Sequence, residues 1–235
     1  MAERVTDMNG ENEPHPEIIH KLQTMPFFST LGEGRLALLT AQARQRIYDV
    51  GETVFLEGEA SQGLYWVQSG WLKAVKYSTA GREQVLHLME PGQTFNEVGA
   101  FTDLANPATV VVLESAQVWL IPRRAIRQLI REDAAFAQHI IDVLADRLRS
   151  SVALVEDLSL RPVTGRLARL ILDEVNGEIL PRPRWYTQNE LAARLGTVTD
   201  VVQRALRQLE ADGLILVERH QIQLLDRDKL EGLAS

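Results

Sequence analysis

Residues 43–122 alternate short runs of β-forming residues with glycines, and this pattern limits the possible folds more than any other feature of the chain. The runs are residues 46–48, 53–56, 64–67, 72–77, 84–88, 109–112 and 118–121, and the glycines are Gly51, Gly58, Gly63, Gly70, Gly81, Gly92 and Gly99. Strands separated by turn signals at this spacing predict a compact antiparallel barrel or roll. Two short helices, around residues 16–22 and 33–42, are expected before it.

A long amphipathic helix is predicted after Pro122, where the apolar period changes from that of strands to that of a helix. Its apolar residues follow alternating steps of four and three, as in the seam of a coiled coil. The seam residues are Ile141, Leu144, Leu148, Ser151, Val155 and Leu158. A second apolar stripe includes Phe136, Ile140, Val143 and Leu154. We expect one stripe to lie on the roll and the other to face a second subunit in a homodimer; the alternative is a helix buried in a monomer.

The dipeptide Arg161-Pro162 interrupts this helix, because proline lacks an amide donor and clashes with the preceding turn. It predicts a hinge, after which a new helix is expected over residues 163–175. The predicted domains are a flexible arm (1–15), a β-roll sensor (16–131), a dimerisation helix with hinge (132–160) and a DNA-binding domain (161–235). The expected fold class is therefore α+β.

Residues 187–213 carry the pattern of a helix-turn-helix. Thr187 with Glu190, and Thr197 with Asp200, each match a capping box, so two helices should begin there. Gly196 suits the turn between them, which needs a positive φ. The shared core is expected to contain Leu191, Leu195, Val202, Leu206 and Leu209. Residues 214–217 and 221–225 then resemble a β-hairpin, so the whole segment is predicted to be a winged helix-turn-helix.

The first turns of the second helix are expected to enter the major groove of DNA. The predicted DNA-contacting residues are Thr187, Gln188, Thr199, Asp200, Gln203, Arg204 and Arg207. Arg204 can bond guanine bidentately, Gln203 can pair with adenine, and Asp200 can accept from cytosine or orient Arg204. Thr187, Gln188 and Arg207 are better placed for phosphates. The alternative for the arginines is surface ion pairing, of Arg204 with Asp200 and of Arg207 with Glu210.

Composition and charge exclude several other classes of protein. The chain has no cysteine, which excludes disulfides, thiolate-bound zinc and cysteine-held iron–sulfur clusters. The net charge is −7, yet basic and acidic residues balance at 11 each from Ser159 onward, as suits specific rather than indiscriminate DNA binding. No run approaches the ~18 apolar residues of a membrane span, and no signal peptide is present, so we expect a cytoplasmic protein. No catalytic or metal-binding constellation is found, so an enzyme is not expected.

A roll, a long helix, a hinge and a winged helix-turn-helix in this order resemble the Crp/Fnr family, the regulators related to the cAMP receptor protein. The resemblance is clearest in PVTGRLARLIL (162–172), ELAARLG (190–196), EGE (57–59) and SGWLK (69–73). It implies dimers that bind palindromic sites in double-stranded DNA and contact RNA polymerase. It also implies that Asp200, Gln203 and Arg204 occupy the base-reading positions.

The resemblance further implies an effector pocket around a phosphate cassette, here residues 96–109. Glu97 matches the family's ribose-binding glutamate, but Asn96 replaces a glycine, Pro107 stands where arginine is expected and Ala108 replaces a serine. The candidate pocket residues are Asn96, Glu97, Val98, Pro107, Ala108, Thr109 and Ser151. Because Pro107 offers neither charge nor donor to a cyclic phosphate, we expect an unidentified small effector other than cAMP.

Three alternatives remain open at this stage. The regulator can respond to a cyclic nucleotide after all, or to haem, which would need an axial ligand. The available ligands are His15, His20, His87, His139, Met25 and Met89. The chain can also be a cyclic-nucleotide-binding-like module without a role on DNA, although the helix-turn-helix argues against it. The sequence leaves the cofactor open.

Overall fold

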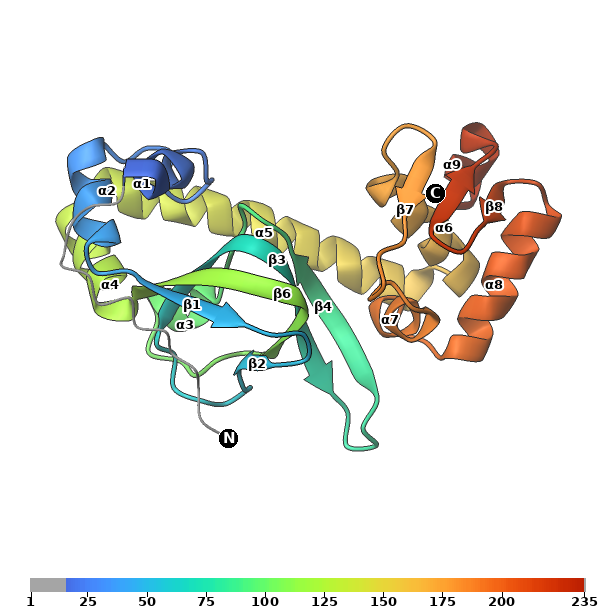
Figure 1. The fold of residues 1–235 in the computed structure, drawn as a ribbon, viewed down its shortest axis with the longest axis horizontal. Coiled ribbons are helices and arrows are strands. Elements are labelled where there is room, and N and C mark those ends of the chain that lie inside the picture. The colour runs from blue at the N-terminus through green and yellow to red at the C-terminus, as the bar shows by residue number, and fades with distance from the viewer. Residues whose placement is uncertain (1–15, 235) are drawn as a thin grey trace. The chain divides into compact units, whose positions relative to one another are not determined.

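The structure is a computed structural model that describes residues 16–234. The side chains of Pro16, Glu17, Ser150, Ala153, Leu154 and Leu158 lie outside the description. The predicted arm, His15 and the seam side chain of Leu158 therefore fall outside it. The chain divides into two compact units, a sensor unit (Met1–Lys76 and Leu86–Leu148) and a C-terminal unit (Tyr77–Val85 and Arg149–Ser235), whose elements are drawn in Figure 1.

The sensor unit is built on an antiparallel six-stranded sheet in the order β1-β6-β3-β4, with β2 paired to β6 and β5 paired to β3. Its strands are β1 (Arg44–Tyr48), β2 (Thr53–Phe55), β3 (Gly63–Tyr77), β4 (Glu83–Met89), β5 (Thr94–Phe95) and β6 (Thr109–Pro122). Its short helices are α1 (Pro16–Gln23), α2 (Glu33–Thr40), α3 (Glu97–Phe101) and α4 (Arg123–Glu132). The predicted antiparallel roll is thus confirmed, while β5, α3 and α4 as separate elements were not predicted.

The sequence pattern divided two long strands into four, and this prediction was wrong. The predicted runs 64–67 and 72–77 both belong to β3, and the runs 109–112 and 118–121 both belong to β6. Gly70 does not end a strand but lies where the register between β3 and β6 shifts. A Cβ at Gly70 would approach the Ser115 carbonyl oxygen to 2.4 Å, and its φ is +83°. The glycine therefore permits a bulge within a continuous strand rather than a turn.

Neighbouring residues of β3 show that both faces of the sheet are covered. Tyr65 packs with Phe55 and Phe95 on one face, with ring centroids 5.0–6.1 Å apart. Trp66 faces the opposite side and stacks on Trp119. That second face is covered by the short helices and by the start of the long helix. Because successive strand side chains alternate in direction, two consecutive buried aromatics require two cores.

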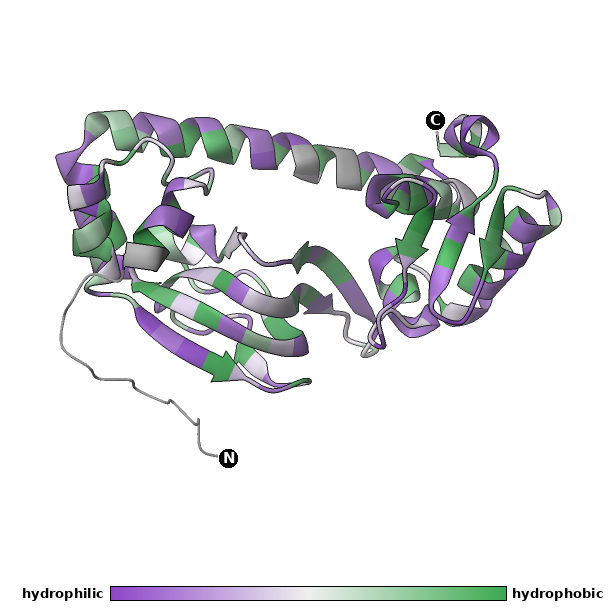
Figure 2. Cartoon of the chain, turned by 45° about the horizontal axis from the view of Figure 1, so that its top comes forward, coloured by the Kyte–Doolittle hydropathy of each residue, from purple (hydrophilic) through white to green (hydrophobic). Residues whose placement is uncertain are grey.

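Helix α5 (Ala134–Leu160) is the long helix that the sequence predicted. Asp133 caps it, since its Oδ1 accepts a hydrogen bond from the Phe136 amide at 3.0 Å and its Oδ2 accepts one from Arg35 at 2.5 Å. Phe136 and Ile140 are buried against the helical side of the sheet. In Figure 2 apolar residues recur along α5 between polar ones.

The C-terminal unit holds a three-stranded antiparallel sheet in the order β7-β9-β8 and a group of helices. Its elements after α5 are α6 (Val163–Glu174), β7 (Ile179–Pro181), α7 (Gln188–Arg194), α8 (Thr199–Ala211), β8 (Ile215–Val217), β9 (Gln221–Leu224) and α9 (Arg227–Ala234). Strands β8 and β9 form the predicted wing, whereas β7 and α9 were not predicted. Within residues 16–234, no helix is both long and apolar enough to cross a membrane.

Candidate nucleic-acid interface and effector cassette

Local hydrogen bonds set the starts of the two helices of the helix-turn-helix. The Thr187 hydroxyl accepts from the Glu190 amide at 3.1 Å, so the first predicted cap is confirmed. The second predicted cap is wrong, because α8 follows Val198 and has no side-chain cap. Thr197 instead closes the turn, its amide donating to the Ala192 carbonyl at 2.9 Å. Gly196 has a φ of +63°, as expected for this turn.

Helix α8 separates a buried face from an outward face. Its buried face consists of Val202, Ala205, Leu206 and Leu209. Asp200, Arg204 and Arg207 are exposed, and Thr199 and Gln203 are half-buried. The Thr199 hydroxyl donates to the Asn189 side-chain oxygen at 2.7 Å and so joins the start of α8 to the start of α7. Of the predicted phosphate contacts on α7, Thr187 is exposed and Gln188 is half-buried.

A polar triad supports the two helices; Tyr186 is buried, and Glu174 and Arg194 are half-buried. Tyr186 donates to Glu174 at 2.8 Å, and Arg194 forms an ion pair with the same carboxylate while lying 5.3 Å from the centre of the Tyr186 ring. Burial, together with the negative charge of Glu174, raises the pKa of Tyr186 far above its usual value. The triad joins α6, α7 and the segment between β7 and α7. Sequence reasoning missed it, because nothing local to any of the three residues indicates the other two.

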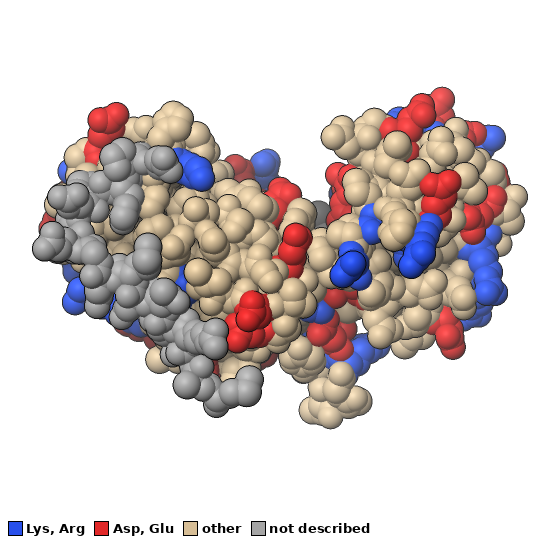
Figure 3. Space-filling model, in the orientation of Figure 1, with Lys and Arg blue, Asp and Glu red and all other residues tan. Residues whose placement is uncertain are grey.

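The arginines of the C-terminal unit fall into two groups. From Ser159 onward, and within the described residues, Arg184, Arg204, Arg207 and Arg219 are exposed and form no ion pair or hydrogen bond, whereas the other basic residues are bonded. The alternative ion pairs of Arg204 and Arg207 are not formed. Glu210, the expected partner of Arg207, instead accepts from the Val217 amide at 2.8 Å. Basic side chains line the edge that α8 forms in Figure 3.

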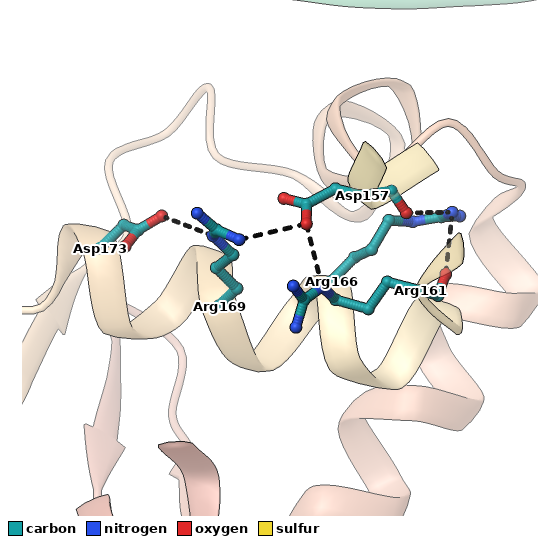
Figure 4. Close-up of polar contacts among 5 residues, drawn as sticks. All are labelled: Asp157, Arg161, Arg166, Arg169 and Asp173. Carbon is teal, nitrogen blue, oxygen red and sulfur yellow. Dashed lines mark hydrogen bonds and ion pairs between the residues drawn. The ribbon is translucent and has the colours of Figure 1, made fainter. Parts of the chain in front are cut away.

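A cluster of charges spans the junction of α5 and α6 (Figure 4). Asp157 accepts from Arg161 Nε at 2.9 Å and from Arg169 Nη1 at 3.2 Å. Arg166 donates to the backbone carbonyls of Asp157 and Arg161, at 3.4 and 3.2 Å. These bonds cross the predicted break at Pro162. The last turns of α5, from Arg149 on, accordingly belong to the same compact unit as α6.

The cassette residue Asn96 is held in a conformation that suits the glycine it replaces. Its φ is 70°, the only positive value for a described non-glycine residue. Asparagine tolerates this region better than most residues. Its side-chain nitrogen lies 3.0 Å from the Ser61 hydroxyl, 3.1 Å from the Gly63 carbonyl oxygen and 3.0 Å from the Asn106 side-chain oxygen. The buried amide therefore fastens the two ends of the cassette to each other.

The carboxylate that the resemblance assigns to a ribose is already paired within the chain. Glu97 forms an ion pair with Arg147 of α5 at 2.6 Å and accepts from the Thr94 hydroxyl at 3.2 Å. Arg147 also bonds Thr94 and lies 4.9 Å from the centre of the Phe27 ring. Burial raises the pKa of Glu97, and the positive charge of Arg147 opposes this rise. Arg147 was not among the sequence candidates.

The other candidate pocket residues differ in their exposure. Val98 and Pro107 are exposed, whereas Ala108 and Thr109 are buried. The Thr109 hydroxyl accepts from the Glu57 amide at 3.0 Å. Ser151 is exposed and belongs to the C-terminal unit, so its place in an effector pocket stays a prediction.

The predicted dimer seam is partly exposed along α5. Ile141, Leu148 and Val155 are exposed, with Leu148 at 65%. Leu144 is half-buried and packs against the apolar core of the sensor unit. The exposed residues recur at seven-residue steps, which puts them on one face of the helix.

The candidate haem ligands are mostly engaged elsewhere. Met25 and Met89 are buried in the two cores of the sensor unit. His139 lies with Nε2 2.5 Å from the Pro26 carbonyl oxygen, while His20 and His87 are exposed. Within residues 16–234, no three His, Asp or Glu side chains are grouped to hold a metal ion.

Two family models match the chain over the elements just described. A cyclic nucleotide-binding domain matches residues 45–133, and a Crp-like helix-turn-helix domain matches residues 165–233. The first covers the strands and the cassette, and the second covers α6 to α9.

Individual relatives match over most of their length. The chain is 27% identical to the cyclic AMP receptor protein of Thermus thermophilus, covering 89% of this chain and 96% of the relative. It is 28% identical to a CRP-like cAMP-activated global transcriptional regulator of Mycobacterium tuberculosis, covering 86% and 93%. The structure of FixK2 from Bradyrhizobium japonicum superposes with a TM-score of 0.73 at 22% identity, covering 82% of this chain and 98% of that one.

Proposed function

The chain belongs to the Crp/Fnr family of DNA-binding transcription regulators, which are not enzymes, and on this premise we propose that it acts as a homodimer reading an inverted repeat through α8. As part of this proposal, residues 161–235 bind DNA, as predicted from the sequence, and the last turns of α5, from Arg149 on, belong to the same compact unit. The protein works in the cytoplasm on double-stranded DNA and contacts RNA polymerase there, as the family resemblance implies. A small effector controls it.

The unpaired arginines of α8 carry the proposal. An exposed arginine without an acidic partner has all of its N–H donors available for DNA, and no neighbouring carboxylate offsets its charge. Arg204 lies in the first turns of α8, where a recognition helix meets base edges. There it bonds guanine, with Asp200 and Gln203 beside it. Arg207, one turn further on, contacts a phosphate and positions the helix without reading bases.

The exposed seam residues of α5 support a homodimer. A symmetric dimer in turn supports an operator that is an inverted repeat. A two-fold axis along the seam places one α8 on each side of it. The two helices then enter successive turns of the major groove, about 34 Å apart, which requires half-sites about 10 to 11 base pairs apart.

The cassette supports an effector other than cAMP, although the two relatives described above are named for cAMP. Glu97 is paired with Arg147, and the amide of Asn96 occupies the glycine position. Pro107 supplies neither a cation nor a donor for a cyclic phosphate. An anion placed there would find no arginine at position 107, and the positive charge of Arg147 is already paired with Glu97.

Binding-site selection from a random duplex library tests the DNA-reading model. Arg204→Ala should lose about 1 to 3 kcal/mol per half-site and relax the preference at one base position. Arg207→Ala should weaken binding to all duplex sequences alike, because a phosphate contact carries no base information. Lys229→Ala is the control, since Lys229 is paired with Asp226 and should change neither property. Recovery of a non-palindromic site, or an unchanged preference in Arg204→Ala, would refute the model.

A further inference from the structure

Resting on the proposed DNA-binding function, we propose that Asn189 and Thr199 are a positioning pair that fixes the direction in which α8 is presented to DNA. The Thr199 hydroxyl, in the first turn of α8, donates to the Asn189 side-chain oxygen, in the first turn of α7, at 2.7 Å. Asn189 is exposed and Thr199 is half-buried. Neither belongs to the apolar core that the two helices share, so the bond adds to that core rather than being part of it.

The proton of the Thr199 hydroxyl is already used within the chain. A hydroxyl has a single proton to donate, and the oxygens of a phosphate only accept hydrogen bonds. While Thr199 donates to Asn189, it has no proton left for a phosphate. The sequence pattern places Thr199 among the DNA-contacting residues, whereas the bond gives it a role that acts through α7.

The pair is a second attachment of α8 to α7. The first attachment lies in the turn, where the Thr197 amide donates to the Ala192 carbonyl at 2.9 Å. A single attachment acts as a pivot about which α8 can rotate, whereas two attachments fix its direction. Asn189 and Ala192 are one helical turn apart and so lie on the same side of α7. Both attachments therefore meet the start of α8 from one side.

Other interactions at the start of α8 do not replace this bond. Among the described residues, no side chain caps α8, which follows Val198. Val202 and Leu206 pack in the same apolar core as α7, but hydrophobic contacts are not directional. A hydrogen bond is directional, and the β-branched side chain of Thr199 occupies few rotamers. The pair therefore restricts rotation of α8 in a way that the core alone does not.

A fixed α8 matters more for reading bases than for binding phosphates. Arg204 lies in the second turn of α8, and the bidentate bonds proposed for it depend on the direction of its guanidinium group. A helix that can rotate loses this freedom when it docks on the operator, and the loss lowers specific affinity. Non-specific binding rests on charge, which the uncharged pair does not change. The pair should therefore raise the ratio of operator affinity to non-operator affinity.

Affinities of the full-length protein for the selected operator and for a scrambled duplex of equal length test this pair. Thr199→Val and Asn189→Ala should each lower the ratio of the two affinities by about 5- to 150-fold, because one hydrogen bond is worth a factor of roughly 2 to 12 and the dimer has two. The double variant should lose no more than either single variant, since both changes remove the same bond. Thr199→Ser keeps the hydroxyl and should retain the wild-type ratio. Gln208→Ala is the control, because it removes a bond to Asp212 further along α8 and should leave the ratio unchanged.

The outcomes separate positioning from direct contact and from loss of folded protein. A ratio that falls through the operator alone, with unchanged affinity for the scrambled duplex, supports the pair. Equal weakening on both duplexes would overturn it, as would wild-type ratios in both single variants or a Thr199→Ser variant as weak as Thr199→Val. Losses that multiply in the double variant would also overturn it, because Thr199 would then contact DNA itself. Failure of the wild type to select any duplex would instead refute the proposed function, and the pair with it.

Discussion

Shortening Leu148 should weaken the dimer by a predictable amount. Leu148 is 65% exposed in the single chain, and a two-fold interface would cover it in both subunits. Full burial of a leucine side chain is worth about 1.5 to 3 kcal/mol, so covering the exposed part contributes roughly 1 to 2 kcal/mol per copy. Leu148→Ala should therefore cost about 2 to 4 kcal/mol of dimerisation free energy, which raises the dimer Kd about 30- to 700-fold.

Sedimentation equilibrium over a range of protein concentrations measures this change directly. The matched control is Leu38→Ala, because Leu38 of α2 is 68% exposed and lies off the seam. It should leave the dimer Kd almost unchanged. Leu148→Glu should give a monomer at micromolar concentration, since the seam would bury an unpaired charge. Equal Kd values for Leu148→Ala and Leu38→Ala, or a dimeric Leu148→Glu, would show that α5 does not dimerise through this face.

Three further predictions concern the effector and the stability of the two units. By calorimetry cAMP should bind no better than about millimolar, since position 107 offers no cation to the phosphate. Pro107→Arg alone should not restore micromolar binding, because Asn96 still occupies the glycine position and Glu97 is still paired with Arg147; a micromolar wild-type Kd contradicts this prediction. Glu174→Ala should lower the free energy of unfolding by about 2 to 3 kcal/mol, because it leaves the half-buried Arg194 without its partner, whereas Tyr186→Phe should cost about 1 kcal/mol. If urea denaturation gave equal losses of unfolding free energy for Glu174→Ala and Tyr186→Phe, the ion pair between Glu174 and Arg194 would add no stability. Burial raises the pKa of Glu97, so ionisation of this carboxyl opposes folding as the pH rises through the acid range, and the stability of Glu97→Gln relative to wild type should increase over that range. A stability difference between Glu97→Gln and wild type that does not vary with pH would contradict this prediction.

Features that depend on a few neighbouring residues could be predicted from the sequence. The cap at Thr187, the turn at Gly196 and the end of the long helix before Pro162 all follow from local backbone preferences. The strand-like and helix-like spacings of apolar residues predicted the antiparallel sheet and α5. They do so because the direction of a side chain follows from its place in a strand or a helix. Gly70 shows the limit, since a glycine pattern alone does not distinguish a turn from a bulge within a paired strand.

Only the tertiary structure decided which charged side chains are bonded and which are free. Glu97 meets Arg147 fifty residues away, and Glu174 meets Arg194 across two helices. Such pairs form because packing of the cores brings distant backbone segments together, and no local rule selects one partner from the many carboxylates and arginines of the chain. By contrast, the local helix pattern was enough to propose Arg204 as a base-reading residue from its place on α8. That Arg184 and Arg219 are equally free became visible only once the positions of all their neighbours were known.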